Sequence, residues 1–116
     1  MDSVNERSRY FTRVSFTDEN GDPVTPMTAE YKIDDIDSGL EVRGWTDITT
    51  LAEQVDVPWE TTDTEILDET KPHELRRMTW RWTYMSPTSP PAESDGTGEY
   101  LLVIKNLKGI TSTSPA

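Results

Sequence analysis

The chain has 116 residues, of which 33% are hydrophobic, and its 22 acidic and 11 basic residues give a formal net charge of −11. This length predicts one domain with a single two-layer core, and the negative charge argues against binding to the phosphate backbone of duplex nucleic acid. The chain contains no cysteine, which excludes disulfides, thiolate nucleophiles and cysteine-ligated metal sites.

The N-terminal segment MDSVNERS is polar and charged. We expect no signal peptide there, and no apolar run of the chain approaches the roughly 20 residues that a membrane-spanning helix needs. We therefore expect a protein made in the cytosol and not bound to a membrane. The expected organisation is a polar N-terminal arm over residues 1–8, one domain over residues 9–110 and a polar tail over residues 111–116.

The first half of the chain alternates apolar and polar residues with a period of two, which is typical of half-buried strands. Between the first two of these runs, Asn20-Gly21 predicts a tight turn because both residues tolerate a positive φ. Strands are predicted from the apolar positions Tyr10, Val14 and Phe16; Ala29, Tyr31 and Ile33; Leu40, Val42 and Trp45; and Val55, Val57 and Trp59.

A cluster of aspartates, Asp34, Asp35 and Asp37, precedes Ser38-Gly39. It could form a metal site, an acidic catalytic patch or a corner between two strands. Calcium loops of the EF-hand type need oxygen ligands at positions 1, 3, 5 and 12 with glycine at 6, and neither this cluster nor the segment from Asp18 has that spacing. We interpret the cluster as a corner, while an irregular calcium loop remains an alternative.

The second half begins with a connection and ends with two further strands. Thr62 and Glu65 match a capping box, which predicts one short helical turn near residues 62–68. Residues 86–98 are rich in Pro, Ser and Gly, which predicts a long loop. Strands are predicted on either side of this loop, one with Met78, Trp80, Trp82 and Tyr84 on one face and one with Tyr100, Leu102 and Ile104.

These short strands and regularly spaced turns predict an all-β fold, specifically an immunoglobulin-like antiparallel β-sandwich of about seven strands, in preference to a small barrel. No catalytic constellation emerges. The single histidine, His73, lies in a polar connection, and no nucleophile elbow or glycine-rich phosphate loop is present. We therefore predict no enzymatic activity and no cofactor.

Two groups of side chains are candidate binding surfaces. The face of Trp80, Trp82 and Tyr84 is either core or a platform on which a ligand stacks. Arginines on the opposite face of this strand, namely Arg77 and Arg81 with Arg76 beside them, and the prolines of the loop are candidates for contact with another protein. These protein-contact candidates are Arg76, Arg77, Arg81, Pro90 and Pro91.

The order of the segments FTDENGDPV, AEYKIDDIDSG, VRGWTDI, QVDVPW and EYLLVIKNLKGI resembles that of small structural proteins of tailed bacteriophages. Those proteins have an immunoglobulin-like or fibronectin-III-like fold, and the resemblance extends over roughly residues 8–110.

The resemblance implies a non-enzymatic virion component, made in the host cytoplasm, that decorates the capsid or belongs to the neck or tail. Its partners would then be other virion proteins, such as major capsid, portal, neck or tail subunits, and it would assemble in multiple copies. The alternative from the residues is a carbohydrate-binding β-sandwich that uses exposed aromatics, with or without calcium.

Overall fold

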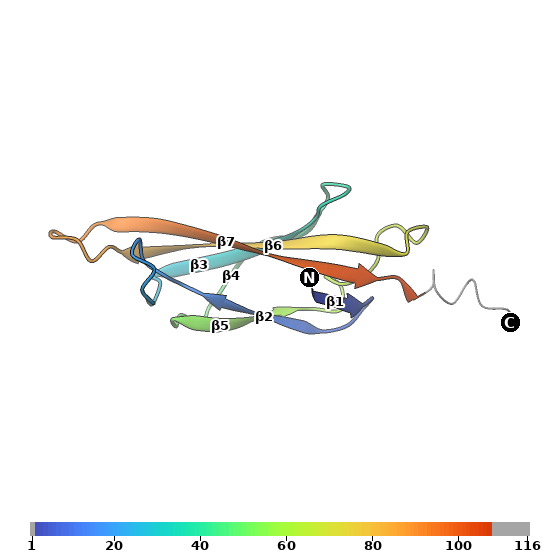
Figure 1. The fold of residues 1–116 in the computed structure, drawn as a ribbon, viewed down its shortest axis with the longest axis horizontal. Coiled ribbons are helices and arrows are strands. Elements are labelled where there is room, and N and C mark those ends of the chain that lie inside the picture. The colour runs from blue at the N-terminus through green and yellow to red at the C-terminus, as the bar shows by residue number, and fades with distance from the viewer. Residues whose placement is uncertain (1, 108–116) are drawn as a thin grey trace, which may run out of the picture.

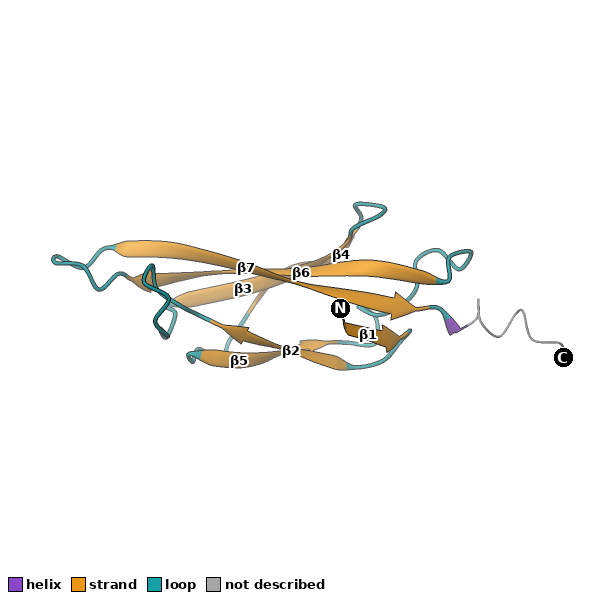
Figure 2. Ribbon diagram, viewed as in Figure 1, coloured by secondary structure: helices purple, strands orange, loops and turns teal. Residues whose placement is uncertain are grey.

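The computed structural model describes residues 2–107, which form seven strands in two sheets (Figure 1 and Figure 2). The second sheet has two strands and lies below the first in the view of Figure 1. The five-stranded sheet has the order β1 (Asp2–Asn5), β7 (Glu93–Lys105), β6 (His73–Met85), β3 (Thr28–Asp35) and β4 (Glu41–Asp47), and the other sheet pairs β2 (Tyr10–Ser15) with β5 (Gln54–Trp59). Neighbouring strands are antiparallel except β1, which runs parallel to β7. The all-β prediction is confirmed.

The core lies between the inner faces of the two sheets, where the predicted alternation places apolar side chains. On β2 and β5, Val14 and Trp59 are fully buried, and the Trp59 indole donates a hydrogen bond of 2.8 Å to Thr12 Oγ1. Phe16 follows β2 directly and meets Trp82 of β6 edge to face, with ring centroids 5.4 Å apart. The predicted inward faces of β2, β3 and β5 are therefore confirmed.

The strand predicted from Leu40, Val42 and Trp45 exists, but its apolar positions do not form a buried face. Leu40 precedes β4 and is 58% exposed, and Trp45 is 38% exposed. The pairing of β3 with β4 shifts register twice. Such irregularities break the alternation of inward and outward side chains, so Trp45 lies on the outer face of the five-stranded sheet.

The prediction of a loop over residues 86–98 is wrong for its second half, because β7 begins at Glu93. Gly96 and Gly98 pair directly with Trp82 and Trp80 on β6. A Cβ atom would lie 2.2 Å from the Trp82 ring at Gly96 and 2.6 Å from the Trp80 ring at Gly98. Glycine is needed at these two positions because it leaves room for the indole rings within a strand. In the sequence, the same glycines predict a loop.

The predicted helical turn near residues 62–68 is also wrong, since this segment forms turns and irregular chain. Glu65 does not reach back to the backbone of Thr62 but pairs with Arg7 at 2.9 Å. Instead, the backbone N–H of Glu60 donates to Asp63 Oδ2 at 2.8 Å. Glu60 and Asp63, rather than the predicted pair Thr62 and Glu65, therefore close a tight turn that follows β5.

Part of the expected N-terminal arm belongs to the sheet, because residues 2–5 form β1. Two phenols hold its first residue. The hydroxyl groups of Tyr100 and Tyr10 both donate hydrogen bonds to Asp2 Oδ2. These bonds lower the pKa of Asp2, and the bond from Tyr100 lowers it most. The predicted tail over residues 111–116 lies outside the described residues.

We predict that Gly96→Ala lowers the free energy of unfolding by about 1–3 kcal/mol, because the added methyl group overlaps the Trp82 ring. The matched control is Gly44→Ala, where the nearest atom to a new Cβ is 3.5 Å away. Urea denaturation followed by tryptophan fluorescence measures both changes. Equal stability of the two variants would contradict the proposed packing of tryptophan over glycine.

Candidate protein-interaction surface

The predicted group of arginines is divided between the two faces of β6. Side chains alternate along a strand, so Arg76 faces the interior while Arg77 and Arg81 lie on the outer face of the five-stranded sheet. Arg76 is 0% exposed. It cannot contact a partner directly, and this member of the predicted interface is therefore corrected to a core residue.

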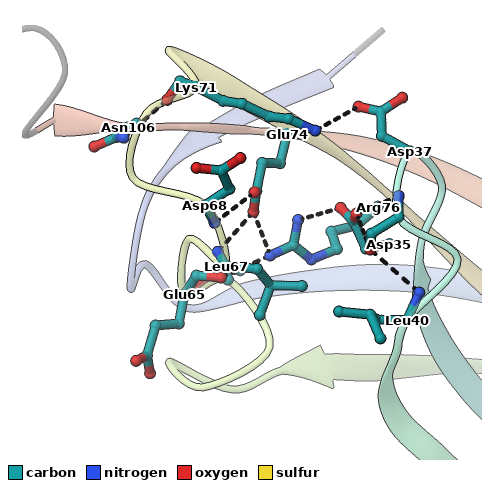
Figure 3. A network of polar contacts seen from close by, with 12 residues as sticks. Asp35, Asp37, Leu40, Glu65, Leu67, Asp68, Lys71, Glu74, Arg76 and Asn106 are labelled. Carbon is teal, nitrogen blue, oxygen red and sulfur yellow. Dashed lines mark hydrogen bonds and ion pairs between the residues drawn. The ribbon is translucent and has the colours of Figure 1, made fainter.

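Arg76 is the centre of a buried ionic network, which Figure 3 shows. Its guanidinium binds Asp35 Oδ1 at 2.8 Å, Glu74 Oε1 at 2.9 Å and the Glu65 carbonyl oxygen at 2.6 Å. Glu74 in turn accepts the backbone N–H groups of Leu67 and Asp68 at 2.8 and 2.9 Å. The network joins β3, β6 and the 65–68 segment, and it lies beside the buried apolar side chains of Leu102 and Ile104 at this end of the sheet.

Asp35 also belongs to the aspartate cluster, and its contacts show the structural role of that cluster. Burial raises its pKa, but hydrogen bonds from the Ser38 hydroxyl and backbone N–H and the charge of Arg76 outweigh this, so the pKa of Asp35 is lowered. The corner interpretation is confirmed by Gly39, which has a φ of +72°. The carboxylate that bonds to the corner is that of Asp35, at 2.6 Å from Ser38 Oγ and 3.0 Å from Ser38 N.

The aspartates of the predicted Asn20-Gly21 turn have a similar structural role. Gly21 has a φ of +82°, and Asp18 Oδ1 accepts the backbone N–H groups of Asn20 and Asp22 at 2.8 and 3.1 Å. Across residues 2–107, no group of three or more His, Cys, Asp or Glu side chains is placed to hold a metal ion.

The outer face of the five-stranded sheet carries a compact cluster of Glu30, Lys32, Trp45 and Arg81, which we call the outer-face cluster. The Arg81 guanidinium lies 3.8 Å from the centroid of the Trp45 ring, and Lys32 Nζ lies 5.4 Å from it. Arg81 is also paired with Glu30. Side chains from three neighbouring strands therefore meet here, and two cations lie close to the exposed tryptophan ring.

A shallow groove of about 360 Å³ adjoins the outer-face cluster and shares Glu30 and Arg81 with it. Its other polar lining residues are the hydroxyl-bearing Thr28, Thr83 and Thr97 together with Asp95. Trp82 and Gly96 complete the lining, so the groove combines short polar side chains with part of an aromatic one.

The other predicted contact residues lie elsewhere. Arg77 is on the outer face and pairs with Asp34 at 3.3 Å. Pro90 and Pro91 are exposed in the loop that joins β6 to β7, at one end of the elongated molecule (Figure 1). The structure thus brings Arg77 and Arg81 onto one face but does not bring the two prolines beside them.

The aromatic face of β6 is core. Trp82 and Tyr84 are 7% and 4% exposed and Trp80 is half-buried, so this face offers no stacking platform. The residue that the sequence analysis missed is Trp45, which was assigned to an inward face. The sequence carries two signals for its outward position: Trp45 is an odd number of residues from Val42, and Gly44 directly precedes it.

Comparisons of the chain with models of protein families, with curated proteins and with solved structures found no match. Within residues 2–107, no helix has the length and apolar character needed to cross a membrane.

We predict that Arg76→Leu lowers the free energy of unfolding by about 3–5 kcal/mol, because it leaves two buried carboxylates without their cation. The control is Arg13→Leu, which removes an exposed pair with Asp56 and should change stability by less than about 1 kcal/mol. Chemical denaturation at neutral pH compares the two. Similar losses in both variants would contradict the role of the network.

The lowered pKa of Asp35 predicts a loss of stability in acid. A carboxyl group with a lower pKa in the folded state stabilises the protein above its unfolded pKa of about 4, and this contribution disappears as the pH falls through the folded value. The loss of stability between pH 7 and pH 3 should therefore be smaller in Asp35→Asn than in the parent chain. Urea denaturation at several pH values between 7 and 3 measures both chains, and an equal loss of stability in both would contradict the role of Asp35.

Proposed function

We propose that this chain is a non-enzymatic structural module that binds neighbouring protein subunits through the outer face of its five-stranded sheet. The observation that carries the proposal is the exposed Trp45, held 3.8 Å from the Arg81 guanidinium. Tryptophan and arginine are enriched at the energetic centres of protein interfaces. A side chain that is already held in place also loses little conformational entropy on binding.

We further infer an immunoglobulin-like sandwich. One sheet of such a fold pairs the second and fifth strands of the domain, and the other contains two adjacent hairpins. The β2–β5 pair and the order β7–β6–β3–β4 agree with this arrangement, and β1 beside β7 corresponds to a first strand that has joined the larger sheet. Trp59 is fully buried in the core cluster, and the chain has no cysteine, which supports a core of aromatic and aliphatic residues.

The neighbouring subunits in this proposal are those of a tailed-phage virion, whether in the capsid, neck or tail, with the chain present in multiple copies. The support is the resemblance of the segments over roughly residues 8–110. The acidic composition favours partners with basic or mixed surfaces.

The test is mass spectrometry and cryo-electron microscopy of purified virions produced with the parent chain, Trp45→Ala or Phe11→Ala. Phe11 is the matched control because it is also an exposed aromatic, at 57%, but lies on the other sheet. Incorporation should fall at least about tenfold for Trp45→Ala, equivalent to about 1.4 kcal/mol, and stay unchanged for Phe11→Ala. Absence of the parent chain from virions would contradict the proposal.

A carbohydrate-binding role is the second candidate, favoured by the groove beside the outer-face cluster. Its threonine hydroxyls and the carboxylates of Glu30 and Asp95 are suitable partners for sugar hydroxyls. Titration of the chain with soluble oligosaccharides, followed by tryptophan fluorescence, tests it. A saturable change that Trp45→Ala removes would favour this role over the structural one.

A further inference from the structure

A long edge of the five-stranded sheet is open. β1 covers β7 only from Leu102 to Lys105, so the part from Glu93 to Leu101 has a neighbour only on its β6 side within the described chain. The Lys105 carbonyl oxygen accepts the Glu6 N–H on the β1 side. Because backbone groups alternate along a strand, the odd-numbered residues of β7, including Thr97, direct their N–H and C=O groups to this open edge.

The remaining edges of the two sheets are less suited to accept a strand. β4 has two register shifts, and the Thr46 hydroxyl donates to the Gly44 carbonyl oxygen at 2.9 Å. β5 contains Pro58, which has no N–H to donate, and β2 is only six residues long. By contrast, β7 is 13 residues long and pairs with β6 without a register shift.

The inner side of this edge has an unusual surface, because Gly96 and Gly98 have no side chains there. The Trp80 ring lies directly against Gly98, with its Nε1 atom 2.7 Å from the position of a Cβ atom. Trp80 Nε1 is buried and has no hydrogen-bond acceptor among the described residues. The inner side of the edge therefore presents glycine backbone without side chains, which a second strand can approach closely.

The outer side of the same edge determines which strand fits. Glu93, Asp95 and Glu99 are exposed there, and no basic residue of β7 lies between them. An antiparallel pair of two such edges centred on Thr97 would place Asp95 opposite Glu99, and like charges in that position repel. Pairing with a second copy is therefore disfavoured, whereas a strand with basic side chains at alternate positions gains favourable cross-strand pairs.

We propose that the β7 edge from Glu93 to Leu101 accepts an extended segment of a partner protein as an added strand, and that basic side chains on this segment meet the acidic outer side. Main-chain hydrogen bonds provide the affinity of this mode of recognition, and alternate side chains provide its specificity. The inference rests on the proposed function as a protein-binding module, but it uses a different surface from the outer-face cluster.

The test uses the full chain and two capped nine-residue peptides, one alternating arginine with valine and the other glutamate with valine. The arginine peptide should bind at least about tenfold more tightly, and it should slow amide exchange at Asp95, Thr97 and Glu99 as measured by NMR. Asp95→Lys/Glu99→Lys should weaken this binding at least about tenfold. The matched charge reversal on β4, Glu41→Lys/Asp47→Lys, should leave it within about twofold.

A second variant tests the hydrogen bonds rather than the charges. Thr97→Pro removes an N–H that points to the open edge and makes no bond within the sheet, and it should abolish binding of the arginine peptide. If Thr97→Pro does not fold, the lysine variants decide the question. Equal binding of both peptides, no binding, slowed exchange at another strand, or self-association of the chain through β7 would each overturn the proposal.

The peptide-binding experiment and the virion experiment can be interpreted independently of each other. Trp45→Ala should leave binding of the arginine peptide unchanged, because Trp45 lies on β4 and not at the β7 edge. Loss of virion incorporation in Trp45→Ala with peptide binding intact supports both surfaces. Peptide binding by a chain that is absent from virions overturns the virion assignment alone.

Discussion

The packing of two tryptophan rings over two glycines is the constraint on which the shape of this molecule depends. Trp82 and Trp80 lie across Gly96 and Gly98 on the adjacent strand, at distances that no side chain would permit. This contact makes β6 and β7 continuous over 13 residues each. The resulting hairpin extends beyond the two-stranded sheet, as Figure 1 shows, and it provides both the outer-face groove and the open edge.

The second organising interaction is the buried ionic network around Arg76, at the opposite end of β6 from the tip of the hairpin. Breaking such a pair is strongly destabilising because a buried charge loses its partner, even though an apolar core would serve as well. Here the network has a positional consequence: it fixes the corner after β3 through Asp35 and the 65–68 segment through Glu74. The corner thereby fixes where β4 begins after β3, and the two register shifts follow farther along this pair of strands.

Much of the fold can be predicted from the sequence, because alternation reflects burial directly. Val14, Ile33 and Trp59 lie on the inner faces that their period of two indicates. The prediction fails where one residue type has two physical uses. Glycine is typical of loops, but Gly96 lies within a strand and leaves room for the Trp82 indole. Arginine is typical of surfaces, but Arg76 is buried because Asp35 and Glu74 pair with it, and their proximity is not evident from the sequence.

The binding surfaces could be predicted only in part for the same reason. Alternation along β6 places Arg77 and Arg81 on the outer face, whereas the interior side chains of β4 do not follow a strict period of two because its pairing with β3 shifts register. The most direct test of the β6–β7 pairing and of the open β7 edge is the rate of amide hydrogen exchange at residues 93–98 in the free chain. We expect slow exchange at Gly96 and Gly98, whose N–H groups bond to β6, and fast exchange at Asp95 and Thr97, whose N–H groups point to the open edge. Uniformly fast or uniformly slow exchange at these four residues would contradict this arrangement of the strands.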